Sequence, residues 1–172
     1  QKFINALWNL DDIFTDQIHF HLPTDNMFYD EKYDLVFHGK TNKKEMLDET
    51  GNIINQKIYD ACVDELKSRL KHLKEKFRKD FVSDYEKIYF RKIEIYPDWV
   101  NEEFYQEIIQ FIKDLHEYFK EKVKTGGFKL IIVLEERYSI PEIKELECDT
   151  LFIRTVRFYA PYDNTKDGAD YE

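Results

Sequence analysis

The chain of 172 residues carries 35 acidic and 26 basic side chains, a net charge of −9 with histidine neutral. Aromatic residues make up 16% of it, ample material for a buried core, and this excludes the disorder typical of charge-rich, apolar-poor chains. Its apolar runs are far shorter than the ~20 residues that span a bilayer, so we expect a soluble, cytoplasmic protein with no membrane partner. The excess of acidic residues disfavours binding to nucleic acid.

The first third of the chain alternates short apolar segments with turns. Apolar spacing predicts an amphipathic helix over 2–14, and β-prone residues predict strands at 18–22 and 33–37. The acidic, aromatic stretch between these two strands reads as loop-like. Residues 40–52 are mostly polar, and a connection of this length is uncommon, so we expect a lid or a flexible loop there.

The strongest periodic signal predicts a long helix over 53–84. Its apolar residues recur three or four positions apart, which places them in one stripe along the helix. The stripe consists of Ile58, Cys62, Leu66, Leu70, Leu73, Phe77 and Phe81. Asn52 or Asn55 could cap the helix start. Between residues 67 and 79 this segment holds seven basic residues and one acid, which we interpret as a solvated helix face.

The second half of the chain alternates strands with helices. Strands are predicted at 88–96, 128–134 and 151–159, and a second long helix at 101–124, with Asp98 as its N-cap. The apolar run at 128–134 has no break. Such runs are typical of strands that are buried on both faces of a sheet.

This alternation favours an α/β fold. We predict a three-layer sandwich in which two long helices flank a mixed or mostly parallel sheet of four to five strands. No break in composition marks a second domain, so we expect one globular domain over 1–172, with a polar tail at 162–172.

Two histidines on the first strand form a candidate metal site. His19 and His21 are two positions apart, so on a strand both imidazoles face the same way and could reach one divalent metal ion. The alternative is that they are ordinary surface histidines. If the chain is not an enzyme, we expect no cofactor.

The carboxyl ends of the predicted strands form a candidate catalytic edge. Ligands of open α/β sheets collect at this edge, where a mixture of acids and bases suits metal-assisted hydrolysis. The candidate residues are His38, Asp98, Glu135, Glu136 and Arg137. Strand ends are polar in most proteins, so the same residues also fit an inert edge.

The two cysteines are too few for a disulfide scaffold. Cys62 lies on the apolar stripe and is interpreted as a small core residue. Cys148 lies between a helix and a strand, and no histidine or basic residue close to it in sequence suggests activation.

The absence of a complete catalytic signature favours a small acidic protein-binding domain, whose partner we expect to be a basic protein. Immunity and antitoxin proteins share this general character. The expected contact residues are carboxylates and aromatics in loop-like stretches: Phe28, Tyr29, Asp30, Glu31, Tyr33 and Tyr162. A second reading is that the three aromatics at 28–33 simply cap one end of the core.

Two alternatives stay open. One is a metal-dependent hydrolase or nuclease-like enzyme with its site at the strand ends, so the sequence does not decide whether the chain is an enzyme. The other is one domain of a larger protein, because the chain begins with Gln1 rather than Met.

Overall fold

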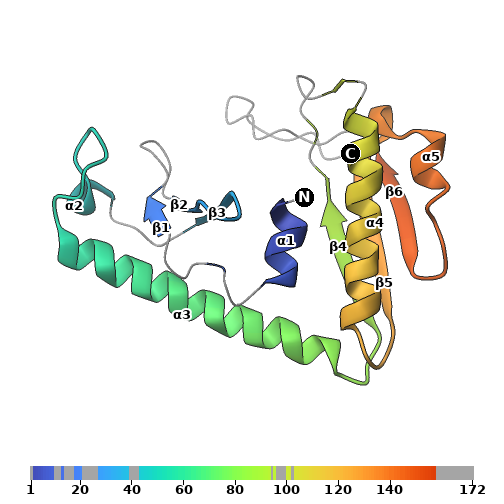
Figure 1. Ribbon diagram of the computed structural model, residues 1–172, viewed down its shortest axis with the longest axis horizontal. Coiled ribbons are helices and arrows are strands. Elements are labelled where there is room, and N and C mark those ends of the chain that lie inside the picture. The colour runs from blue at the N-terminus through green and yellow to red at the C-terminus, as the bar shows by residue number, and fades with distance from the viewer. Residues whose placement is uncertain are drawn as a thin grey trace. The chain divides into compact units, whose positions relative to one another are not determined.

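The computed structural model describes residues 2–9, 13, 18–20, 27–38, 43–93, 95, 100, 101 and 103–157. The chain, drawn in Figure 1, divides into two compact units, Gln1–Ser83 (unit 1) and Asp84–Glu172 (unit 2), each with a sheet of its own. The expectation of a single domain stays a prediction, because two compact units can still unfold as one cooperative whole.

Unit 1 combines a small antiparallel sheet with one long helix. Its elements are α1 (Lys2–Trp8), β1 (Ile18–Phe20), β2 (Met27–Asp30), β3 (Leu35–His38), α2 (Lys43–Met46) and α3 (Gln56–Phe81). The strands pair in the order β1-β2-β3, and both pairings are antiparallel. The helix predicted over 2–14 is confirmed for its first half, and the strands predicted at 18–22 and 33–37 correspond to β1 and β3.

β2 lies in the acidic, aromatic stretch that the sequence suggested to be a loop. Between β2 and β3 the chain turns through residues 31–34. The Asp30 carboxylate accepts a hydrogen bond from the Tyr33 backbone N–H at 3.1 Å, and Asp34 has a φ of 54°, a left-handed conformation that Asp tolerates better than most residues. This hairpin contains no glycine, so its turn has no strong sequence signal.

α3 confirms the long helix predicted over 53–84. The Asn55 side chain caps it by accepting a hydrogen bond from the Ile58 N–H at 3.3 Å. Leu66 and Leu70 of the stripe are buried in the core of unit 1, whereas Leu73 is 49% exposed. The core consists of Ala6, Ile13, Phe28, Tyr33, Met46, Leu47, Leu66 and Leu70.

Residues 43–52 belong to the predicted lid or flexible loop, yet they are anchored in this core. Met46 and Leu47 are buried, and Leu47 pairs with Ile53 in an isolated antiparallel bridge. The Asp48 carboxylate closes the turn by accepting hydrogen bonds from the backbone N–H groups of Thr50 and Asn52, both at 2.9 Å. Two buried apolar side chains and one capped turn therefore anchor this part of the segment, and its role as a lid or flexible loop stays a prediction.

Unit 2 is built on a parallel sheet. Its elements are β4 (Lys87–Lys92), α4 (Phe104–Lys122), β5 (Phe128–Glu135), the 3-10 helix η2 (Glu136–Tyr138), α5 (Pro141–Lys144) and β6 (Leu151–Val156). The order is β4-β5-β6 with both pairings parallel, which confirms one parallel sheet built from the segments predicted at 88–96, 128–134 and 151–159. The sandwich with four to five strands is not confirmed, because the strands of unit 1 form a separate sheet.

β5 is the central strand, but its two faces differ in burial. Leu130, Ile132 and Leu134 are completely buried, whereas the alternating residues Ile131 and Val133 are only half-buried. α4 packs against β5, and a strand presents alternate side chains to opposite faces. The expectation that both faces of this strand are buried was therefore wrong for the face that carries Ile131 and Val133.

α4 confirms the second long helix, although its start differs from the prediction. The Asn101 side chain accepts hydrogen bonds from the backbone N–H groups of Glu103 and Phe104, at 3.0 and 2.9 Å. Asp98, the predicted cap, lies outside the described residues. In the described part of the chain no helix is both long enough and apolar enough to cross a membrane.

Candidate functional site

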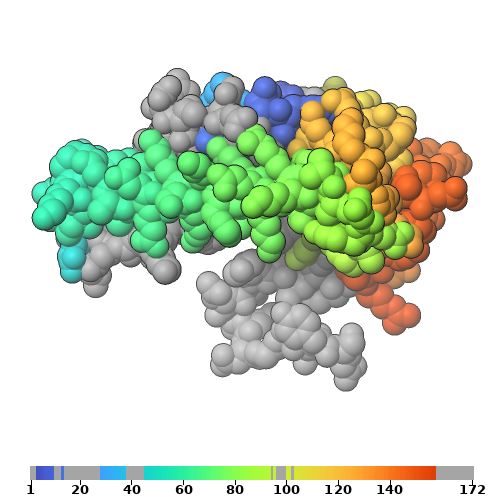
Figure 2. All heavy atoms as spheres, turned by 90° about the horizontal axis from the view of Figure 1, so that it is seen from below, coloured from blue at the N-terminus to red at the C-terminus, as the bar shows by residue number. Residues whose placement is uncertain are grey.

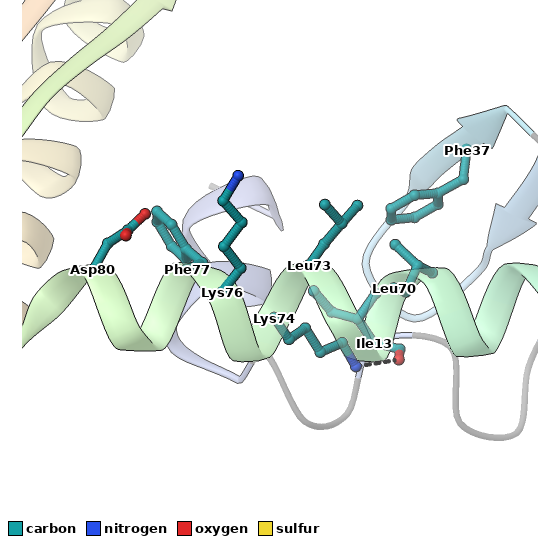
Figure 3. A pocket seen from close by; sticks show the side chains of 8 residues that line it. All are labelled: Ile13, Phe37, Leu70, Leu73, Lys74, Lys76, Phe77 and Asp80. Carbon is teal, nitrogen blue, oxygen red and sulfur yellow. Dashed lines mark hydrogen bonds between the residues drawn. The ribbon is translucent and has the colours of Figure 1, made fainter.

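Unit 1 contains an apolar cavity of about 380 Å³, open on one side (Figure 3). It lies between α3, β3 and the segment that carries Ile13. The lining residues are Ile13, Phe37, Leu70, Leu73, Lys74, Lys76, Phe77 and Asp80. Five of these eight side chains are apolar, and three are charged.

The local structure explains why these apolar residues meet. Leu70, Leu73 and Phe77 are three and four positions apart on α3, so they occupy one face of the helix. Phe37 reaches toward Leu70 and Leu73 from β3, as Figure 3 shows. Leu73 is 49% exposed, so this part of the wall is in contact with solvent.

The charged residues lie around the edge of the cavity. Lys74 is held in place, because its ammonium group donates a hydrogen bond to the Ile13 carbonyl at 3.0 Å. In Figure 3 the Lys76 side chain extends from the same side of α3 as Leu73, and Asp80 stands at one end. Two ammonium groups against one carboxylate leave the edge with one excess positive charge.

The surrounding helix surface increases this positive charge. The basic residues between 67 and 79 are exposed, apart from the half-buried Lys74. Figure 2 shows side chains of α3 lying on the surface along the length of the helix. A cavity with apolar walls and a cationic edge suits a ligand with an apolar body and an anionic group.

The candidate catalytic edge is divided between the two sheets. Glu135 ends β5 and is buried. Its Oε2 atom accepts a hydrogen bond from the Arg137 Nη2 atom at 2.9 Å, and its Oε1 atom forms an ion pair with the Arg137 Nε atom at 2.7 Å. Glu136 is exposed in η2. His38 ends β3 in the other sheet, its side chain is not among those described, and Asp98 lies outside the described residues.

This arrangement gives Glu135 a structural partner. A bidentate guanidinium neutralises a buried carboxylate that would otherwise lack compensation. His38 and Glu135 end strands of different sheets, and a catalytic role for the five candidate residues stays a prediction.

Most of the expected contact residues between positions 28 and 33 are buried. Phe28, Asp30 and Tyr33 are 0%, 3% and 5% exposed, so they belong to the core and the hairpin turn and do not present a contact surface. Tyr29 donates a hydrogen bond to the Asp34 carboxylate at 2.6 Å. Glu31 is exposed, and Tyr162 lies outside the described residues.

The predicted metal site cannot be assembled from the described side chains. His19 lies on β1 opposite Tyr29, but its side chain and the whole of His21 are outside the described part. Within the described residues there is no group of three or more His, Cys, Asp or Glu side chains suited to a metal ion. Metal binding by His19 and His21 stays a prediction.

Sequence reasoning missed the cavity, although a signal for it exists. The apolar stripe of α3 continues past Leu70 into the basic segment, where Leu73 and Phe77 alternate with lysines. A helix face that is only solvated has no need of the apolar Leu73 and Phe77.

Comparison with models of protein families, with curated proteins and with solved structures finds no match to this chain.

Proposed function

We propose that unit 1 is a binding module for a small amphipathic anion, with the apolar part in the cavity and the charged group at the lysine edge. The carrying observation is the combination of five apolar side chains with Lys74 and Lys76 in the lining of one cavity. The cavity volume of about 380 Å³ lies at the small end of the range for ligand pockets, roughly 300–1,000 Å³.

Binding, rather than catalysis, is the class of function that the lining supports. The walls supply hydrophobic contact, and the eight lining residues include no serine, threonine, cysteine or histidine that could act as a nucleophile or general base. A medium-chain carboxylate matches this chemistry. Its acyl chain leaves water for the apolar walls, and its carboxylate approaches an ammonium group.

A basic protein partner, which the net charge of −9 favours, remains a separate proposal. Its test must avoid Asp30, because that carboxylate holds the hairpin turn from a buried position. Glu31→Lys changes the exposed charge of the same stretch without touching the core. Unchanged binding of a co-purifying basic protein by this variant would exclude this stretch as the contact surface.

The amphipathic-anion proposal is tested with three ligands that share a ten-carbon chain: decanoate, decanol and decyltrimethylammonium. We expect decanoate to bind most tightly, decanol more weakly and the cation most weakly, as measured by calorimetric titration. Shortening decanoate to octanoate should weaken binding by up to about fourfold for each methylene removed, since a buried methylene contributes roughly 0.8 kcal/mol.

Two variants locate the site. Leu73→Gln should weaken decanoate binding by placing a polar group in the wall, and Lys76→Gln should remove the preference for decanoate over decanol. Lys71→Gln is the matched control, because it makes the same charge change on an exposed residue of α3 outside the cavity. Equal effects of Lys76→Gln and Lys71→Gln would show that only the general charge of α3 matters and would contradict the proposal.

A further inference from the structure

Unit 2 brings together a cysteine and a histidine that are 32 residues apart in the chain. His116 lies on α4, and Cys148 and Thr150 lie in the turn that leads into β6. The His116 Nε2 atom is 2.8 Å from the Thr150 Oγ1 atom. The Cys148 Sγ atom is 3.9 Å from that same nitrogen and 3.7 Å from the Thr150 hydroxyl.

The turn holds the sulfur in a defined position. The Leu151 N–H donates to the Cys148 carbonyl at 3.2 Å, and the Cys148 N–H donates to the Leu151 carbonyl at 3.0 Å. The Thr150 carbonyl accepts a hydrogen bond from the Leu130 N–H of the central strand at 2.8 Å. Cys148 is nevertheless exposed, so a small reagent can reach a sulfur that the sheet keeps in place.

The surroundings of Cys148 favour its thiolate. Desolvation and the nearby Asp149 raise the pKa of the thiol, but hydrogen bonds from the backbone and hydroxyl of Thr150 and the backbone of Leu151 outweigh them and lower it. A lowered pKa increases the fraction of thiolate, which is the reactive form.

His116 can complete this arrangement as a neutral imidazole. Desolvation and the charge of Lys120 lower the pKa of His116, against the opposite effect of Glu117. The neutral ring can accept a proton from the thiol. Once the thiolate has formed, Nε2–H can donate to the Thr150 oxygen while the Thr150 hydroxyl donates to the sulfur.

We propose that Cys148 undergoes reversible thiol–disulfide exchange with low-molecular-weight disulfides, with His116 and Thr150 as positioning residues. The Cys148 thiolate attacks one sulfur of the disulfide, and the S–S bond of the small molecule breaks as a new S–S bond forms to Cys148. The second sulfur leaves with the electron pair and takes the proton that Cys148 released. Cys148 is oxidised to a mixed disulfide, and one equivalent of small thiol is the reduced product.

The second cysteine of the chain provides an internal comparison. Cys62 is half-buried on α3 and packs against the core of unit 1. We therefore expect the folded protein to take up one equivalent of small thiol, at Cys148, when it is treated with oxidised glutathione and analysed by intact mass and peptide mapping. Cys148→Ser should abolish the adduct, and Cys62→Ser should leave it unchanged.

The pH dependence of the rate separates an activated thiol from a merely accessible one. In the Cys62→Ser background, the folded protein should react about three- to tenfold faster at pH 7 than the urea-unfolded chain, and its rate should inflect below the ~8.5 of a free cysteine. An inflection at or above that value with equal folded and unfolded rates would overturn the proposal. So would an adduct found on Cys62 of the wild-type protein.

Thr150 is tested by a variant that keeps its shape. Thr150→Val should move the inflection upward, and Thr150→Ser should restore it, whereas a purely structural role would not move it. Thr155→Val is the matched control, since Thr155 is exposed on β6 outside the cluster. An unchanged inflection in folded Thr150→Val would remove Thr150 from the proposed site.

Discussion

At the scale of single residues, Asp48 shows how one carboxylate organises a turn. Its two oxygens accept hydrogen bonds from Thr50 and Asn52, and those of the Thr50 hydroxyl and the Asn52 backbone are the main causes that lower its pKa to about 2. Each of these bonds favours the ionised form. The turn connects the buried Leu47 to Ile53, so protonation of the half-buried Asp48 acts on the edge of the core.

The stabilising effect of Asp48 should depend on pH in a defined window. Its pKa is lower in the folded protein than the usual 3.8, so its contribution is complete above about pH 4 and is lost as the pH falls toward 2. We expect Asp48→Ala to lower the unfolding midpoint in urea at pH 6, and the difference from wild type to shrink between pH 4 and pH 2. A constant difference over this range would show that the charge has no part in the effect.

At the scale of elements, α3 serves two environments along one stripe. Leu70 is 9% exposed and packs in the core, while Leu73, one turn further along, is 49% exposed at the cavity. Helical periodicity places both residues on the same face. Helical periodicity does not determine which part of that face is covered by the rest of unit 1.

Both leucines line the cavity, but only Leu70 is buried, so truncating each should separate core packing from the exposed part of the wall. Leu70→Ala should cost roughly 2–5 kcal/mol of unfolding free energy, because it removes buried methyl groups and leaves a void. Leu73→Ala should cost well under this and should weaken decanoate binding instead. Chemical unfolding and calorimetric titration of the two variants check this, and equal losses of stability would mean that the cavity is closed in solution.

The turn between α4 and β5 offers a second matched pair. Gly126 and Gly127 both have a φ of 72°, but a Cβ atom on Gly126 would collide with the Tyr85 carbonyl oxygen, whereas one on Gly127 would meet nothing within 4 Å. Gly127→Ala should therefore cost only the strain of the left-handed backbone, about 1–2 kcal/mol. Gly126→Ala should cost clearly more, since backbone must move, and thermal unfolding of both variants measures the difference.

At the scale of the whole molecule, two compact units carry separate sheets and separate functions in our proposals. The core cluster around Leu66 and Leu70 is formed entirely by residues of unit 1, and the parallel sheet entirely by residues of unit 2. Regions with their own buried apolar contacts often open as separate cooperative units.

Hydrogen exchange should reveal this division. Leu70→Ala should speed amide exchange in α3, with little change in β5, and Ile132→Ala should have the reverse effect, because the two buried residues belong to different units. Equal acceleration in both units by either variant would show that residues 1–172 unfold as one domain.

The sequence by itself determined the two long helices and the three strands of the parallel sheet. These signals are local: the 3.6-residue period of the α3 stripe, the Asn55 cap and the unbroken apolar run of 128–134 can be read within a single segment. The same locality placed Leu66 and Leu70 on one apolar stripe, and both are buried.

The tertiary structure alone decided which segments meet. The division into two sheets, the one-sided burial of β5, the insertion of Phe28 into the core and the bidentate contact of Arg137 with Glu135 depend on packing and on side-chain geometry. Cys148 had no basic partner within its own segment, and only the fold of unit 2 places His116 beside it. Both candidate sites bring together residues from separate segments, because a cavity or a reactive pair is a property of surfaces in space, and neighbours in sequence carry little information about such surfaces.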